Sequence, residues 1–275
     1  MAFKLAAIVP HPPILIPGIG KENLLRLEKT RNIYNQIEEE IRAEKIDTII
    51  IISSHGPIRP AVFGINISTE FEINFEEFGD FSTKMSINGD SELAQNIREF
   101  LIEKPEVQAI SQPVLDHGCG VPLYSLLFNY FDKNSSGGLG KNIEIVPIYA
   151  SNAGLKEHFE LGKLIRGQIE KGRKKIAILA SGDLSHTVTK NSPAGYSARG
   201  AKFDQRLIEC LQEKKIEDIL NFDDSLIAEV KPCGLKAIAM LLGALNGTGY
   251  DILSTSYEPP FGVGHLTMLL KPLPN

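Results

Sequence analysis

Short apolar runs rich in β-branched residues alternate along this chain with longer segments whose apolar residues recur every three or four positions. The first such unit is a predicted strand over residues 5–9, a predicted helix over 22–44 and a second strand over 48–53. The run IAILA at 176–180 is apolar throughout, which is typical of a central strand in a parallel sheet that is covered on both faces. This alternation predicts an α/β fold.

The sheet is predicted to be mixed, because strands in the middle of the chain are bounded by Gly, Asp and Asn, which suit antiparallel pairing. The further predicted strands cover residues 61–67, 84–87, 143–148, 175–180, 252–257 and 266–270. The further predicted helices cover residues 91–103, 121–131, 155–171, 198–213 and 233–245. No internal repeat or linker divides the 275 residues, so we predict one domain over residues 1–275, with a mixed central β-sheet flanked by helices.

Composition and charge exclude several classes of protein. The 29 basic and 34 acidic residues are interspersed and leave a net charge of −5, which argues against a nucleic-acid partner. Three cysteines without paired spacing argue against a disulfide scaffold and suit a reducing compartment. No apolar stretch approaches the ~20 residues that a membrane span requires, and no secretory leader is apparent. We therefore expect a cytoplasmic protein with no membrane partner.

Three of the six histidines follow the ends of predicted strands. His11 follows the first strand, His55 follows the second, and His186 comes a few residues after the IAILA run. The carboxyl ends of the strands in an open α/β sheet form the crevice in which ligands bind. Any one of these residues could be an ordinary hydrogen-bonded loop histidine. Three of them at equivalent strand ends predict a shared site.

Among the other histidines and cysteines, His117 could belong to the site, and most of the rest are predicted to lie outside it. His117 lies at a turn before a predicted helix, and two roles stay open for it: a hydrogen-bond donor to substrate or dioxygen, or a structural residue. His158 lies on a charged helical segment and is predicted to face solvent. His265 begins the last predicted strand and is predicted to be structural. Cys119 and Cys210 are placed outside the site.

The third metal ligand is expected near the predicted helix that begins around residue 233. Two imidazoles and one anionic ligand leave half of an octahedron open, an arrangement in which Fe(II) holds a substrate and dioxygen together. Cys233 opens the helix and Glu229 lies just before it, where the helix dipole favours an anion. A carboxylate suits Fe(II), whereas a thiolate favours copper or zinc. A small buried cysteine without a metal remains the alternative for Cys233.

Four short motifs in this order resemble the class III extradiol ring-cleavage dioxygenases, the family of the protocatechuate 4,5-dioxygenase β subunit. The motifs are PHPP at 10–13, SSHGP at 53–57, LDHG at 115–118 and SGDLSH at 181–186. The resemblance spans nearly the whole chain. Cys-Gly at 233–234, together with SGDLSH, is similar to the Memo-like branch, and the segment SYEPPFGVGHL is similar to its prokaryotic members.

The resemblance implies roles for the residues at these motifs. His11 and His55 would be metal ligands, His186 the acid/base that takes a proton from a catechol hydroxyl, and His117 a substrate-binding residue. The third ligand is a Glu in the dioxygenases and a Cys in the Memo-like branch. Cys233 matches the latter pattern in position, and Glu229 is the alternative. Glu258 is a remote third candidate that we expect to be a strand-end residue.

Two functions follow from this resemblance. The first is a non-haem Fe(II) extradiol dioxygenase that opens a catechol-type aromatic diol with dioxygen. The alternative is a Memo-like protein that binds copper, zinc or iron in a redox or docking role without ring cleavage. A homo-oligomer is expected in either case, and a companion subunit or an AMMECR1-type partner is the further expectation. A serine hydrolase is disfavoured because the chain has no Gly-x-Ser-x-Gly elbow.

Overall fold

The central sheet has eight strands in the described part of the chain, in the order β6-β3-β7-β2-β8-β1-β10-β9. The computed structural model describes residues 2–57, 62–101, 103–104, 106–131 and 143–274. The strands of this sheet are β1 Phe3–Val9, β2 Thr48–Ser53, β3 Phe63–Asn66, β6 Val107–Ile110, β7 Glu144–Tyr149, β8 Ile176–Ser181, β9 Tyr250–Glu258 and β10 His265–Pro272. A separate hairpin is formed by β4 Glu70–Phe75 and β5 Asp80–Asn88.

Helices lie between many of the strands along the chain. They are α1 Pro17–Gly20, α2 Glu28–Glu44, α3 Ser91–Phe100, α4 His117–Phe131, α5 Leu155–Ile169, α6 Gly200–Gln212, α7 Ile216–Leu220, α8 Asp224–Val230 and α9 Leu235–Ala244. Short 3₁₀ turns occur at Pro13–Leu15, Lys21–Leu27, Glu76–Phe78 and Pro260–Gly262. Among the described residues, no helix combines the length and the apolar character needed to cross a membrane.

The predicted α/β class with a mixed sheet is confirmed. β8 lies between β1 and β2 and is parallel to both, which is the central position that its apolar sequence predicted. β7 runs parallel to β2, so these four strands end at the same edge of the sheet. β10 is antiparallel to β1 and β9 is antiparallel to β10, which makes the sheet mixed.

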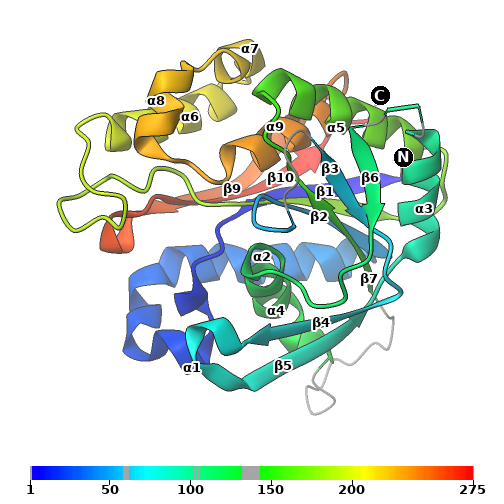
Figure 1. Cartoon of the computed structure of the whole chain (residues 1–275), viewed down its shortest axis with the longest axis horizontal. Helices are drawn as coiled ribbons and strands as arrows, with labels where there is room; N and C mark the ends of the chain where they lie inside the picture. The colour runs from blue at the N-terminus through cyan, green and yellow to red at the C-terminus, as the bar shows by residue number, and fades with distance from the viewer. Residues whose placement is uncertain (1, 58–61, 102, 105, 132–142, 275) are drawn as a thin grey trace.

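Helices cover both faces of the sheet (Figure 1). α5 and α9 pack on one face, and α2 and α4 pack on the other together with the β4–β5 hairpin. Side chains along β1 alternate between the two hydrophobic clusters, with Ala6 and Ile8 on the α5–α9 side and Leu5, Ala7 and Val9 on the opposite side. The strand is buried on both faces because the side chains on each face of the sheet contact a layer of helices.

The sequence did not predict every element. The predicted helix over 22–44 begins as a 3₁₀ turn and becomes α-helical only at Glu28. β4 was missed although Phe71, Ile73 and Phe75 are buried in alternation with more exposed residues, a pattern with the period of a strand. β6, α7 and α8 were also missed, because segments of four to seven residues are too short to reveal a period.

Candidate metal centre

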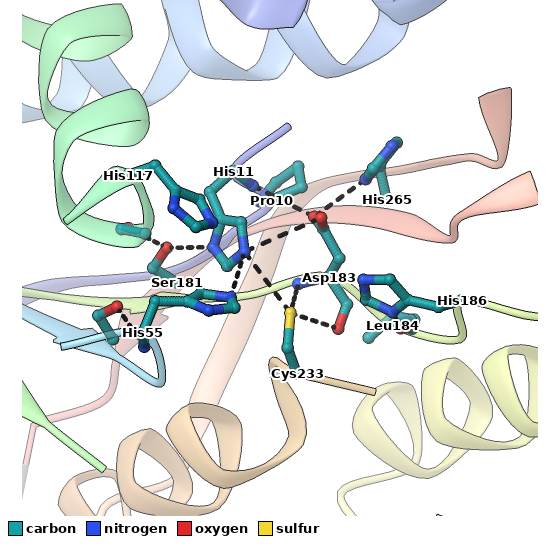
Figure 2. A network of polar contacts seen from close by, with 12 residues as sticks. Pro10, His11, His55, His117, Ser181, Asp183, Leu184, His186, Cys233 and His265 are labelled. Carbon is teal, nitrogen blue, oxygen red and sulfur yellow. Dashed lines mark hydrogen bonds and ion pairs between the residues drawn. The ribbon is translucent and has the colours of Figure 1, made fainter. Parts of the chain in front are cut away.

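Two of the histidines that follow strands meet at the carboxyl edge of the sheet (Figure 2). His11 follows β1 and is buried, and His55 follows β2 and is exposed. Their Nε2 atoms lie 3.1 Å apart and their ring centroids 4.8 Å apart. The parallel arrangement of β1, β8 and β2 brings together two residues that are 44 positions apart in the chain.

Cys233 is the third member of this cluster. It lies just ahead of α9, and its Sγ is 3.5 Å from Nε2 of His11. One ligand atom from each of His11, His55 and Cys233 can be chosen so that all three lie within 4.8 Å of one another. The structure therefore brings together three of the five residues that the sequence offered as metal ligands.

Two glycines allow Cys233 to reach this position. A Cβ on Gly182 would lie 2.0 Å from the Cα of Gly234, and a Cβ on Gly234 would lie 2.8 Å from the carbonyl carbon of Gly182. The backbone after β8 and the backbone before α9 thus touch without side chains between them. The Gly234 N–H donates to the carbonyl of Asp183 at 2.8 Å, which fixes the contact.

Replacing Gly182 with alanine should therefore force these two segments apart. We expect a loss of about 1–3 kcal/mol in the free energy of unfolding, because the added methyl group meets backbone that cannot rotate away. Denaturant unfolding measures this loss. Gly167→Ala is the matched control, since a Cβ there meets nothing within 4 Å and the residue lies inside α5. That control should gain about 0.5–1 kcal/mol, and equal effects of the two substitutions would contradict the steric argument.

Hydrogen bonds set the tautomer of His11. Pro122 in α4 has no N–H, so the carbonyl of Gly118 four residues earlier lacks its usual helical donor. The Ser181 hydroxyl donates to that carbonyl instead. Because its single proton is used there, Ser181 Oγ accepts a hydrogen bond from Nδ1–H of His11, at 3.0 Å. The neutral His11 ring then presents an unprotonated Nε2 to the cluster.

The electrostatics and spacing of the cluster fit a metal ion. Burial lowers the pKa of His11 to about 3, so its ring is neutral at physiological pH. The ring of His55 packs against His11 and His117, and the resulting loss of water lowers its pKa as well. Ligand atoms about 2.0–2.3 Å from one ion lie roughly 3–3.7 Å apart. The 3.1 and 3.5 Å separations of the donor atoms fall within this range.

The buried carboxylate of Asp183 contacts two histidines at the candidate metal centre, His11 and His265. Asp183 Oδ1 accepts from the backbone N–H of His11 at 3.2 Å and contacts Nδ1 of His265 at 3.0 Å. Burial by itself would raise the pKa of Asp183, but the imidazoles of His265 and His11 hold it well below its usual range. The backbone N–H of Asp183 also donates to the Cys233 sulfur at 3.1 Å. Burial raises the pKa of the Cys233 thiol, so the thiolate needs a cation to form.

Asp183 was not among the site residues predicted from the sequence, and His265 was predicted only to be structural. A signal for both was present. Asp183 comes two residues after β8 ends. His265 is the first residue of a strand antiparallel to β1, and the beginning of such a strand lies at the carboxyl edge of its parallel neighbours.

His117 and His186 lie beside the three candidate ligands. The His117 ring centroid is 4.5 Å from that of His55 and 5.3 Å from that of His11, and its Nδ1 lies 3.4 Å from a Glu77 carboxylate oxygen. His186 and Asp183 form a second group of potential ligand atoms with Cys233, again within 4.8 Å. Nδ1 of His186 lies 3.0 Å from the carbonyl oxygen of Leu184, which can only accept. Nδ1 therefore carries the proton, and Nε2 of the neutral ring is free to accept one.

The two candidate carboxylates lie elsewhere. Glu229 is exposed, accepts from the Ser197 hydroxyl and pairs with Arg199 at 2.9 Å. Glu258 accepts hydrogen bonds from the backbone N–H and the hydroxyl of Thr30 at 2.8 and 2.9 Å, and thereby holds the first turn of α2. The structure does not bring either carboxylate into the cluster.

The prediction that His158 faces solvent is wrong. This residue is fully buried on α5, where its ring packs against Phe63 with centroids 4.8 Å apart. Its Nδ1 donates to the Gly154 carbonyl at 2.7 Å, and its Nε2 accepts from the backbone N–H of Ser151 at 3.3 Å. The charges that flank it in the sequence lie on the outer face of the helix, whereas position 158 falls on the inner face.

The chain is similar over most of its length to several known proteins. A family model described as the catalytic LigB subunit of aromatic ring-opening dioxygenase matches residues 5–267. Protein CA_C1420 of Clostridium acetobutylicum is 30% identical over 98% of this chain, and the chain spans 57% of the length of that relative. The 3,4-dihydroxyphenylacetate 2,3-dioxygenase of Escherichia coli is 25% identical over 94% of this chain and 96% of its own length. The crystal structure of the uncharacterized protein JW3007 from Escherichia coli K12 has a TM-score of 0.66 at 17% identity, covering 97% of this chain and 99% of that one.

Proposed function

This chain belongs to the family of catalytic LigB subunits of aromatic ring-opening dioxygenases, and from that premise we propose that it is an extradiol dioxygenase that opens a catechol-type diol at a metal centre. The observation that carries the proposal is the convergence of His11, His55 and Cys233, with His186 and His117 beside them. Two neutral imidazoles and one residue that can become anionic suit a divalent metal with open positions.

The residues of the cluster divide into those that hold the metal and those that act on the substrate. His11, His55 and Cys233 would hold the ion, and Asp183 would orient His11 through its backbone N–H. A bound ferrous ion would supply the positions at which the diol and dioxygen are held together. His186 would take the proton of a diol hydroxyl at Nε2, because its Nδ1–H is held by the Leu184 carbonyl. His117 would donate a hydrogen bond to the substrate.

The test is to load the protein with Fe(II) under anaerobic conditions, add each catechol of a panel, and then admit air. The panel includes 3,4-dihydroxyphenylacetate, because one relative carries that substrate in its name. A yellow ring-opened product is expected. His186→Gln should lower kcat about 10²- to 10⁴-fold, as expected when a general base is removed. Its iron content should equal that of the unmodified protein, because His186 is outside the proposed ligand set.

Iron content and turnover together decide the outcome. A His186→Gln variant that retains full kcat would remove His186 from the mechanism. A His186→Gln variant that loses its iron would instead place this residue in the ligand set. Anaerobic binding of the catechol to the iron-loaded variant shows whether the substrate site is still intact.

A second function is favoured by one specific observation, the cysteine at the third ligand position. A thiolate suits copper or zinc better than it suits oxygen-activating Fe(II), and no carboxylate ligand from Glu229 replaces it. The alternative is a metal-binding protein with a redox or docking role and no ring cleavage. Stoichiometric metal binding without product from any catechol of the panel would favour it over the dioxygenase.

A further inference from the structure

A cavity of about 610 Å³ adjoins the candidate metal centre. Its wall is formed by the segment 150–155 between β7 and α5, by α8, and by the first residues of α9. This volume lies within the range of roughly 300–1,000 Å³ that small-molecule sites occupy. The segment after β7 lies at the same edge of the sheet as the residues after β1, β2 and β8, so the cavity lies beside the cluster of Figure 2.

The cavity and the metal centre share residues. Cys233 lines the cavity and contributes the sulfur that lies beside His11. Ser54, the neighbour of His55, lines it as well. The cavity and the proposed metal site therefore adjoin at Cys233 and at the residue before His55.

Lys236 places a positive charge in the wall of this cavity. It lies on the first turn of α9, is half-buried, and donates from Nζ to the carbonyl of Ser151 at 2.7 Å. Among the described residues, no ion pair joins Lys236 to a carboxylate. Burial lowers the pKa of this ammonium group, which is the direction expected for a charge that lacks a counter-ion. Such a charge costs free energy unless an anion pairs with it.

The backbone around Lys236 adds to the positive potential. α9 has ten residues and α5 has fifteen, and both begin at this cavity, at Leu235 and Leu155. Neither N-cap residue makes a side-chain hydrogen bond to the helix. Glu157 in the first turn of α5 offsets the dipole of that helix, whereas α9 has no acidic residue in its first turn, so the N-terminus of α9 adds positive potential beside Lys236. Asp224 contributes one carboxylate to the wall, and it is exposed at the start of α8.

The rest of the wall is mixed, because Ser54, Ser151 and Asn152 lie among apolar residues. Leu155, Ile227, Pro232 and Leu235 line the cavity together with Ala153. Apolar side chains around a few polar groups are the usual composition of a site for an organic molecule. A substituent with an apolar part and a charged group can therefore contact this wall, with the charged group beside Lys236.

We propose that this cavity accepts the substituent of the substrate ring, and that Lys236 binds a carboxylate on it and so selects anionic catechols over neutral ones. The proposal rests on the proposed function for the identity of the ring, but the contact with Lys236 concerns binding alone. Lys236 is a specificity-determining residue in this scheme and takes no part in proton transfer.

The experiment compares an anionic and a neutral catechol in anaerobic binding to the Fe(II)-loaded protein. Isothermal titration calorimetry is run with 3,4-dihydroxyphenylacetate and with 4-methylcatechol. Lys236→Met should weaken binding of the anionic ligand about 10- to 100-fold, because a charge-assisted hydrogen bond is lost. The affinity for the neutral ligand should change by less than about threefold, since no charged partner is involved. Lys236→Arg should keep the preference for the anion.

Lys156→Met is the matched control, because Lys156 is an exposed lysine at the start of α5 that does not line this cavity. It should bind both catechols as the unmodified protein does. Equal weakening of both ligands in Lys236→Met, or no weakening of either, would overturn the proposal, and so would failure of the unmodified protein to bind the anionic catechol.

Turnover in air separates this proposal from the proposed function. If Lys236 selects the anionic catechol but no ring-opened product forms, the proposal about Lys236 stands and the proposed dioxygenase activity is rejected. Product formation with the same affinity for charged and neutral catechols would retain the dioxygenase and reject the anion site.

Discussion

His11→Ala is expected to abolish metal binding, leaving a folded protein that retains almost no ion after desalting. The unmodified protein should hold about one ion per chain, the stoichiometry of a site with three protein ligands. Nε2 of His11 lies 3.1 Å from Nε2 of His55 and 3.5 Å from Sγ of Cys233, so it is close to both other members of the cluster. Its loss should weaken affinity at least ~100-fold, beyond the 10- to 100-fold effect of losing a residue that only orients a ligand. Metal analysis and competition with a chelator measure the change.

His158→Asn is the control for this experiment, because it removes a buried imidazole that takes part in no group of potential ligands. It should keep its full metal content. Circular dichroism establishes that both variants are folded. His55→Ala offers a second test at an exposed position, where substitution disturbs packing less. Full metal content in both His11→Ala and His55→Ala would refute the site.

Cys233→Ser should remove the sulfur ligand, whereas Glu229→Ala should leave metal binding unchanged. Replacing the thiol is expected to weaken metal affinity at least ~10-fold, because a hydroxyl is a much poorer ligand for a borderline or soft ion. Glu229 is held by Ser197 and Arg199 at the surface, so its removal affects only an exposed ion pair. Substitution with Co(II) gives a direct signature, since a thiolate ligand produces an intense near-ultraviolet charge-transfer band.

The band should be present in the unmodified protein and in Glu229→Ala, and absent in Cys233→Ser. Cys210→Ser is the control for loss of a buried thiol, because Cys210 lies on α6 and belongs to neither group of potential ligands. If Glu229→Ala loses the ion and Cys233→Ser retains it, the third ligand is the carboxylate and the chain must rearrange to supply it.

Local sequence patterns predicted most of the elements that build the site. The apolar runs at β1, β2 and β8 were recognisable because a strand covered on both faces needs apolar residues in every position. The position of His11 and His55 after such strands placed them at the same edge of the sheet. His158 was misassigned because neighbouring charges do not reveal on which face of a helix a given residue lies. β6 was missed because four residues are too few to show a period, and β4 was missed although its buried residues alternate with more exposed ones.

The sequence by itself determined the α/β class and the histidines that stand at strand ends, since both depend on local hydrophobic patterns and on the direction in which strands run. It left the third ligand open between Cys233 and Glu229, which are four positions apart. Only the tertiary structure decided which residue approaches His11, because that depends on the close contact of Gly182 with Gly234, two residues 52 positions apart. The position of Lys236 in the cavity wall also arises from such long-range contacts, which no local pattern encodes.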